Sequence, residues 1–167
     1  MTERGAFRVS VEKDYLVFAS AHFITFAGHR CEGLHGHNYR VRVTLEGALN
    51  EESWFVFDFV ELKRIMRRLC DEIDHLVLLP LESDRVGVRE EGDTVHVSVD
   101  GAPRYVFPRR DCALLPIPNT TVEMIAQMLI ARLRAELEKA GATGITAIEM
   151  EVEENFGQAA TCRVTVE

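Results

Sequence analysis

The segment Cys31-Glu-Gly-Leu-His35-Gly-His37-Asn-Tyr39 leads directly into a stretch of alternating apolar and polar residues. Between Tyr39 and Leu45 every odd-numbered position is apolar, and the positions between them are polar. Because successive side chains of a strand point to opposite faces, this pattern predicts a strand over residues 38–47 with one solvated face. His35 and His37 share the parity of the apolar side. We therefore expect both imidazoles to project from the end of the buried face.

Two neutral imidazoles aimed at one point suit a first-row metal, most often zinc. Cys31 lies just upstream, so a thiol is expected beside that metal. A third ligand is available in His22, which closes the apolar, strand-like segment Tyr15–Ile24. The alternative for the His-x-His pair is a histidine-rich surface turn, and the alternative for His22 is a core histidine satisfied by a hydrogen bond.

The chain has 167 residues, of which 47% are hydrophobic, which is enough for one domain with a core and too short for two. Its 27 acidic and 19 basic residues give a net charge of −8, which argues against a nucleic-acid or membrane-surface partner. The four cysteines are widely spaced without a Cys-x-x-Cys pair, and the sequence shows neither a signal-peptide pattern nor a long apolar run. We expect a cytoplasmic protein with reduced thiols.

The first helix is predicted to follow a short strand at Ser53–Phe57. It begins at Asp58, an N-cap that we expect to pair with Glu61 in a capping box. Apolar residues at helical spacing predict its buried side, and they are Phe59, Leu62, Ile65, Met66, Leu69 and Ile73.

Residues 81–118 predict a β-meander inserted between the two helices. Its short strands are expected at 86–90, 94–99 and 104–107, joined by turn-forming residues. The second helix then begins at Thr120, paired with Glu123, and ends at Gly141. Its apolar face indicates that it packs on the same core as the first helix.

The last part of the chain predicts a hairpin, with a turn at Asn155–Gly157. Apolar residues alternate with glutamates from Ile148 to Glu153, and the return strand runs through Ala160 to Val166. Glu154 has the parity of the apolar positions, so a regular strand would turn this carboxylate toward the core, where it needs a partner or a function. A bulge that returns Glu154 to solvent is the alternative.

Taken together, these residues resemble the 6-pyruvoyl-tetrahydropterin synthase / 6-carboxytetrahydropterin synthase family, in order along nearly the whole chain. The most specific match is Cys31-x-x-x-His35-Gly-His37-Asn-Tyr39, and the others are Phe18–His22, Val56–Lys63, Ile73–His75, Asn119–Glu123 and Glu154. The resemblance implies an α+β tunnelling fold (T-fold). Its core is an antiparallel four-stranded sheet with two helices on one face, here with the meander inserted. Such domains form barrels, so we expect a homo-oligomer, a trimer or hexamer, with pockets between subunits.

The resemblance also implies a role for each site residue. The metal is Zn²⁺, and the substrate is 7,8-dihydroneopterin triphosphate. The implied groups are His22, His35 and His37 for zinc; Cys31, Asp74 and His75 for catalysis; and Glu154, Thr120 and Thr121 for substrate binding. The basic residues that would hold the triphosphate are not evident, although His29 and Arg30 lie near the motif.

Three products are compatible with this resemblance. We expect 6-carboxytetrahydropterin, the product of the deazapurine (queuosine-type) route, ahead of 6-pyruvoyl-tetrahydropterin. Glu32 directly follows Cys31, and relatives with a glutamate in place of the cysteine resemble folate-pathway enzymes that release 6-hydroxymethyl-dihydropterin. Because both residues are present, Glu32 is a further candidate catalytic residue. Two alternatives from other classes are a structural zinc site closed by Cys31 and a pterin-binding oligomer without activity.

Overall fold

The computed structural model describes residues 6–166 and contains a six-stranded main sheet of order β11-β10-β4-β1-β5-β9. A three-stranded sheet, β6-β7-β8, and a small β2-β3 hairpin complete the strands of these residues. The main-sheet strands are β1 (Phe7–His22), β4 (His35–Gly47), β5 (Val77–Pro80), β9 (Cys112–Leu115), β10 (Ile145–Asn155) and β11 (Gln158–Thr165). The other elements are β2 (Thr25–Phe26), β3 (Arg30–Cys31), β6 (Val86–Glu91), β7 (Thr94–Val99), β8 (Ala102–Pro108), α1 (Phe59–Asp71), α2 (Val122–Lys139) and the short 3₁₀ helix Arg109–Asp111.

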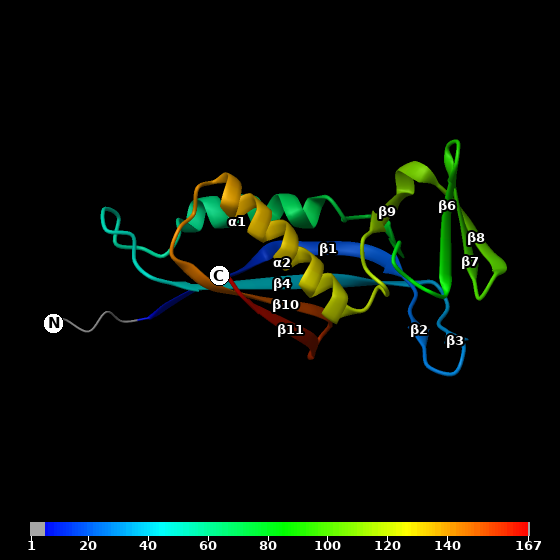
Figure 1. Ribbon diagram of the computed structural model, residues 1–167. Coiled ribbons are helices and arrows are strands. Elements are labelled where there is room, and N and C mark those ends of the chain that lie inside the picture. Colours follow the sequence, from blue (N-terminus) through cyan, green and yellow to red (C-terminus); the bar gives the residue numbers. More distant parts are fainter. Residues whose placement is uncertain (1–5, 167) are drawn as a thin grey trace.

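Strand β4 lies in the middle of the main sheet, between β1 and β10, and is antiparallel to both. The predicted alternation is confirmed, because the apolar residues Tyr39, Val41, Val43 and Leu45 are all fully buried. Both helices cover this apolar face, as Figure 1 shows. The α+β class, the four antiparallel strands β1, β4, β10 and β11, and the two helices on one face are therefore as expected.

The helix ends confirm the prediction in part. The Asp58 side chain caps α1, because Oδ1 accepts from the Val60 amide at 2.6 Å. Glu61 does not complete a capping box; its carboxylate pairs with Arg64 instead. The prediction that Thr120 caps α2 is wrong, since the helix begins one residue later and its N-cap, Thr121, makes no side-chain cap.

Two further expectations are corrected by backbone hydrogen bonds. Residues 53–57 form turns and bends, not a strand. The Trp54 amide donates to the carbonyl of Asn50, and Trp54 adopts a positive φ of 58°, which is incompatible with an extended strand. Phe59, expected on the buried side of α1, is 49% exposed because it lies in the first turn, at the edge of the core.

The insertion between the helices has two parts. Strands β6, β7 and β8 form the separate antiparallel sheet that we call the meander, at the opposite end of the molecule from the start of β1 in Figure 1. Strand β9, from the end of the insertion, joins the main sheet in parallel with β5, which is itself parallel to β1. The main sheet is therefore mixed and six-stranded, where four antiparallel strands were expected.

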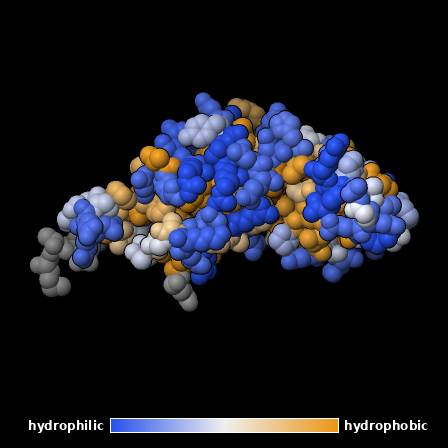
Figure 2. All heavy atoms as spheres, turned by 90° about the horizontal axis from the view of Figure 1, so that it is seen from above, coloured by the Kyte–Doolittle hydropathy of each residue, from blue (hydrophilic) through white to orange (hydrophobic). Residues whose placement is uncertain are grey.

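The meander has its own small core. Its apolar residues pack around Phe23, which follows β1, and the half-buried Cys31 packs against the same cluster. Seen from the helix side in Figure 2, the surface over the helices is largely hydrophilic, as expected for the solvated faces of two amphipathic helices. None of the helices in residues 6–166 is long and apolar enough to cross a membrane.

Replacing the α1 cap tests how much this helix end contributes to stability. Asp58→Ala removes the only side-chain acceptor of the Val60 amide among the described residues, and we expect a loss of about 1 kcal/mol in the free energy of unfolding. Asp58→Asn keeps an acceptor oxygen and should stay close to the wild type. Urea denaturation of both variants measures the difference, and equal destabilisation would contradict the capping role.

Candidate active site

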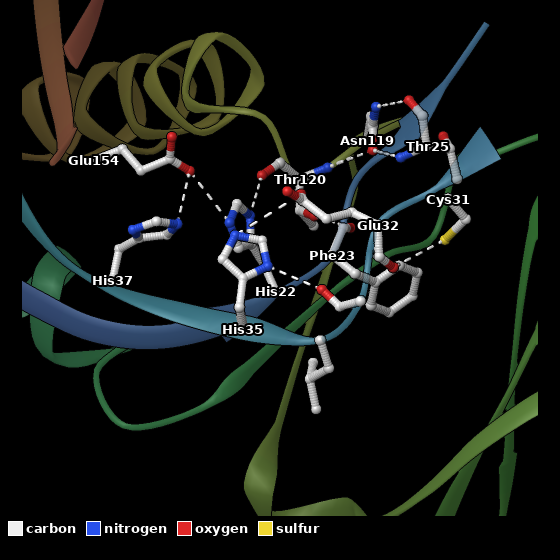
Figure 3. A network of polar contacts seen from close by, with 12 residues as sticks. His22, Phe23, Thr25, Cys31, Glu32, His35, His37, Asn119, Thr120 and Glu154 are labelled. Carbon is white, nitrogen blue, oxygen red and sulfur yellow. Dashed lines mark hydrogen bonds and ion pairs between the residues drawn. The ribbon is translucent and has the colours of Figure 1, made fainter.

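Three histidines from two paired strands meet at one end of the main sheet. Strand β1 ends at His22 and β4 begins at His35, and these two residues lie opposite each other in the register, as do Ser20 and His37. The candidate ligand atoms of the three imidazoles lie within 4.8 Å of one another. Figure 3 shows the three rings converging on one point. The expectation of a three-histidine cluster is therefore met by the strand register.

Backbone carbonyls fix the orientation of two of these rings. His22 Nδ1 lies 2.7 Å from the Thr120 carbonyl, and His35 Nδ1 lies 2.9 Å from the Gly33 carbonyl. With Nδ1 donating to each carbonyl, Nε2 of the neutral ring carries a free lone pair. Burial lowers the pKa of His22, although the Thr120 carbonyl and the Glu154 carboxylate act in the opposite direction. The neutral form that a metal requires is therefore favoured at His22.

The Nε2 atoms also explain why this cluster suits a metal ion. Nε2 of His22 and Nε2 of His37 are buried and make no hydrogen bond within the described part of the chain. Buried polar atoms normally have a partner, so two such atoms facing a third imidazole fit a bound cation. Three neutral imidazoles are a ligand set of catalytic zinc sites, which keep a further position open for water or substrate. His22, His35 and His37 can therefore hold Zn²⁺.

Glu154 lies directly beside the histidines. Its Oε1 is 3.2 Å from Nε2 of His22 and 3.4 Å from Nε2 of His37, in directions that do not make hydrogen bonds. The side chain is 24% exposed, and the pairing of β10 with β11 becomes irregular at this residue. The alternation along β10 therefore predicted correctly that Glu154 lies on the same face as the apolar residues. Its carboxylate is turned toward the histidine cluster.

The adjacent residues Cys31 and Glu32 point in different directions. Oε2 of Glu32 lies 3.8 Å from Nε2 of His35, so this carboxylate reaches the metal cluster. The Cys31 sulfur instead lies 3.4 Å from the backbone carbonyl of Glu32 and on the meander side, apart from the three rings in Figure 3. The expected thiol beside the metal is therefore not seen in this arrangement, where the group of described residues that could hold a metal consists of the three histidines. Strand-like alternation separates the two side chains.

Asp74 and His75 form the expected pair after α1. His75 Nδ1 is 2.8 Å from Oδ2 of Asp74, whose Oδ1 accepts from the Ala19 amide at 2.7 Å. Partial burial acts to raise the pKa of Asp74, but the hydrogen bonds from Ala19 and His75 outweigh it and lower the pKa. The His75 amide donates to the Ala19 carbonyl at 2.6 Å, which holds this residue at a positive φ of 58°. The pair is therefore fixed against β1, while the His75 ring is exposed.

One cavity of about 670 Å³ connects several of these groups. Asp74, His75, His37 and Glu154 all line it, together with two basic residues that the sequence did not single out, Arg40 and Arg67. His29, one of the two basic residues considered from the sequence, lies elsewhere and is 3.7 Å from Asp100. The cavity therefore brings the acid–base pair and two guanidinium groups to the same side of the histidines.

Thr120 supports the site from within the core. Its hydroxyl is fully buried and donates to the Phe23 carbonyl at 2.8 Å, while its own carbonyl orients His22. The Thr120 side chain is therefore not on a surface that substrate can reach in this chain, and the partly exposed Thr121 remains the candidate. Asn119, the first residue of the matched segment Asn119–Glu123, holds the same loop by exchanging two hydrogen bonds with the Thr25 backbone.

Tyr39 was interpreted from its pattern as a core residue, and it also forms part of the site. Its ring stacks on Phe18 and lies edge-on to His22 and His37, at centroid distances of 5.9 and 5.7 Å. The hydroxyl is buried without a hydrogen-bond partner among the described residues, and burial raises the pKa of Tyr39. Alternation alone cannot distinguish such a residue from ordinary core.

Gly36 offers a test of the strand register at the metal cluster. A Cβ there would lie 3.1 Å from the Ser20 carbonyl, so Gly36→Ala must separate β4 from β1 by a few tenths of an ångström. We expect zinc affinity to fall on the order of tenfold, as for other changes that misalign metal ligands. Gly33→Ala is the matched control, since a Cβ there meets nothing within 4 Å. Competition with a chromophoric chelator measures the zinc affinity of both variants. Equal affinities would contradict the claim that close pairing of β1 and β4 at Gly36 sets the ligand geometry.

Comparison with known proteins gives a consistent result. A sequence model described as 6-pyruvoyl tetrahydropterin synthase matches residues 10–165. A protein of Methanocaldococcus jannaschii, provisionally named 6-carboxy-5,6,7,8-tetrahydropterin synthase, is 36% identical over 152 residues, which are 91% of this chain and 92% of that protein. The likeness therefore extends over nearly the whole length of both chains.

Solved structures agree with the sequence matches. The crystal structure of 6-pyruvoyl tetrahydropterin synthase from Plasmodium vivax has a TM-score of 0.87 and 32% identity, covering 97% of this chain and 99% of that one. Another structure of that protein, with the same TM-score, identity and coverage, is described as a catalytic-residue mutant in which a glutamate is replaced by alanine.

Proposed function

The chain belongs to the 6-pyruvoyl tetrahydropterin synthase family, and from that premise we propose a zinc-dependent lyase that converts 7,8-dihydroneopterin triphosphate to 6-carboxy-5,6,7,8-tetrahydropterin. The name of the Methanocaldococcus jannaschii relative supports this product. The observation that carries the proposal is the convergence of three imidazole Nε2 atoms beside Glu154. The reaction balances with uptake of one water and release of triphosphate and a two-carbon aldehyde. We place it in the cytoplasm, on the deazapurine (queuosine-type) route.

In this proposal the protein supplies a metal site and a cradle for the pterin ring. His22, His35 and His37 hold Zn²⁺, which when bound acidifies the substrate's side-chain hydroxyls and stabilises negative charge on oxygen. The Glu154 carboxylate accepts paired N–H groups from the aminopyrimidine edge, a charge-assisted contact that fixes the ring. Thr121 contacts the same ring.

Asp74 and His75 move protons in the proposed reaction. The carboxylate orients the imidazole and stabilises its protonated form, as in other carboxylate–imidazole pairs. Both residues line the cavity that also holds His37 and Glu154, and the guanidinium groups of Arg40 and Arg67 in that cavity can attract the triphosphate.

The acid–base pair and the Cys31 thiol line different cavities within residues 6–166. Asp74 and His75 line the cavity next to Glu154, whereas Cys31 lines a different one at the meander. We therefore propose a homo-oligomer, a trimer or hexamer, in which Cys31 of one subunit meets the Asp74–His75 pair of another. Pairing of exposed sheet edges between subunits would support such an assembly.

The oligomeric state is open to direct measurement. Light scattering of the purified, zinc-loaded protein should give a mass of at least three chains at micromolar concentration. A monomer at every concentration tested would contradict the shared site, because Cys31 would then have no Asp74–His75 pair to act with.

A second candidate reaction is favoured by the position of Glu32. Because its carboxylate lies 3.8 Å from His35 Nε2, Glu32 is better placed than Cys31 to act as a base at the metal cluster. The Plasmodium vivax variant, in which the residue replaced is a glutamate described as catalytic, supports this choice. The product would then be 6-hydroxymethyl-dihydropterin, as in folate synthesis.

This cleavage balances without any co-reactant. Glu32 takes the proton of the C2′ hydroxyl, the C1′–C2′ bond breaks, and its electron pair passes to C1′, which is conjugated with the imine of the ring. A proton returned to C1′ gives the hydroxymethyl group. The other fragment leaves as the triphosphate ester of glycolaldehyde.

The two reactions are distinguished by their products. Zinc-loaded protein is incubated with 7,8-dihydroneopterin triphosphate, and the products are identified by mass. Cys31→Ala should reduce tetrahydropterin formation by about 10²-fold or more, and Glu32→Gln should reduce hydroxymethyl-dihydropterin to the same degree, since each removes an acid–base group.

Matched controls lie outside the site. Cys162→Ala removes a half-buried thiol of β11, and Glu51→Gln changes an exposed carboxylate in a turn. Both should leave each product unchanged. Tetrahydropterin formation that survives Cys31→Ala would contradict the role of the thiol, and the absence of any pterin product from the wild type would contradict the proposed function as a whole.

A further inference from the structure

The meander holds the loop that carries Cys31 and Glu32 at two points. The Arg104 guanidinium donates to the backbone carbonyl of Glu32 at 3.0 Å, and the Tyr105 hydroxyl accepts from the Leu34 amide at 3.2 Å. Arg104 Nε also donates to that hydroxyl at 3.1 Å, which joins the two contacts into one network. The contacts lie on either side of Gly33, so the meander grips the loop around its most adaptable residue.

Arg104 and Tyr105, which we call the clamp, are held in position by aromatic packing. The Tyr105 ring lies against Phe23 and Phe107, each at a centroid distance of 5.5 Å. Phe23 is fully buried and immediately follows the metal-cluster residue His22. The clamp therefore packs against the residue that directly follows β1. The contact between Tyr105 and Phe23 sets the distance from the clamp to the metal cluster.

A second arginine of the insertion, immediately before β6, holds the other end of the loop. Arg85 donates to the carbonyls of Phe26 and Arg30, at 2.6 and 3.3 Å, and pairs with Asp100 at 2.7 Å. The segment from the β2–β3 hairpin to Leu34 is thus held at both ends by side chains of the insertion.

The consequence of this attachment is the separation of the thiol from the carboxylate. Cys31 packs on the apolar cluster of the meander and lines a cavity of about 400 Å³ with His29, Asp100 and Arg104. Glu32, the next residue, faces His35. Neighbouring residues of an extended segment point to opposite sides, so holding the backbone in this orientation holds Glu32 at the histidines and Cys31 away from them.

We propose that the meander, through Arg104 and Tyr105, is a specificity element that decides which of Cys31 and Glu32 reaches the metal cluster, and so sets the ratio of the two products. This inference rests on the proposed function, since it assigns cleavage to Glu32 and tetrahydropterin formation to Cys31. The clamp raises the share of the Glu32 product relative to a chain in which the loop is free. When the clamp is released, rotation about Gly33 lets the thiol compete. Gly33 has no side chain, so its backbone dihedral angles are the least restricted in this loop.

The product ratio tests the proposal directly. Tyr105→Phe keeps the ring and removes only the acceptor of the Leu34 amide, and Arg104→Gln removes the guanidinium. In zinc-loaded full-length protein with 7,8-dihydroneopterin triphosphate, the ratio of hydroxymethyl-dihydropterin to tetrahydropterin should fall at least tenfold in the double variant. A ratio within twofold of the wild type would overturn the proposal. Arg110→Gln is the control, an 88% exposed arginine of the same insertion without contact to the loop.

A readout without substrate separates this inference from the proposed function. Hydrogen exchange of the Leu34 amide, followed in the zinc-loaded and the metal-free protein, should be about tenfold faster in Tyr105→Phe and unchanged in Arg110→Gln. Unchanged exchange in Tyr105→Phe would overturn the clamp. Absence of pterin products from a wild type with a protected Leu34 amide would overturn the proposed function and, with it, the assignment of products. Pterin turnover with an unaltered ratio would overturn the inference alone.

Discussion

The antiparallel pairing of β1 with β4 is the constraint on which the rest of the structure depends. It places His22 opposite His35 and Ser20 opposite His37, so two residues far apart in sequence share one metal cluster. The pairing is close at Gly36, where a side chain would press on the Ser20 carbonyl. A slip by one residue would turn the histidines to the other face, together with the buried residues from Tyr39 onward. Core packing and ligand geometry are therefore fixed by the same register.

The site gathers polar atoms at the edge of an apolar core, and some of these atoms have hydrogen-bond partners while others do not. Backbone carbonyls of Thr120 and Gly33 accept from Nδ1 of His22 and His35, and the buried Nε2 atoms of His22 and His37 have no hydrogen-bond partner among the described residues. Two carboxylates, Glu154 and Glu32, lie beside these atoms. Unpartnered buried nitrogen atoms are costly to a metal-free chain, so binding of a cation at this point also stabilises the fold.

The insertion changes what the surrounding residues can do. Its last strand, β9, widens the main sheet, while the meander forms a second core that includes Phe23 and holds the Cys31–Leu34 loop. The main sheet therefore presents the three imidazoles, and the meander holds the backbone of the loop that carries Cys31 and Glu32. The two meet at Phe23, one residue beyond the metal ligand His22.

The sequence by itself determined the features that arise from local periodicity and local chemistry. Alternation gave β4, the parity of His35 and His37 and the inward direction of Glu154, and the position of Asp58 gave the start of α1, because each depends only on nearby backbone geometry. Only the tertiary structure decided which way Cys31 and Glu32 point, that Thr120 is buried behind His22, and that β5 and β9 extend the sheet. These outcomes depend on contacts between segments far apart in the chain, such as Arg104 with Glu32, and no local pattern records them.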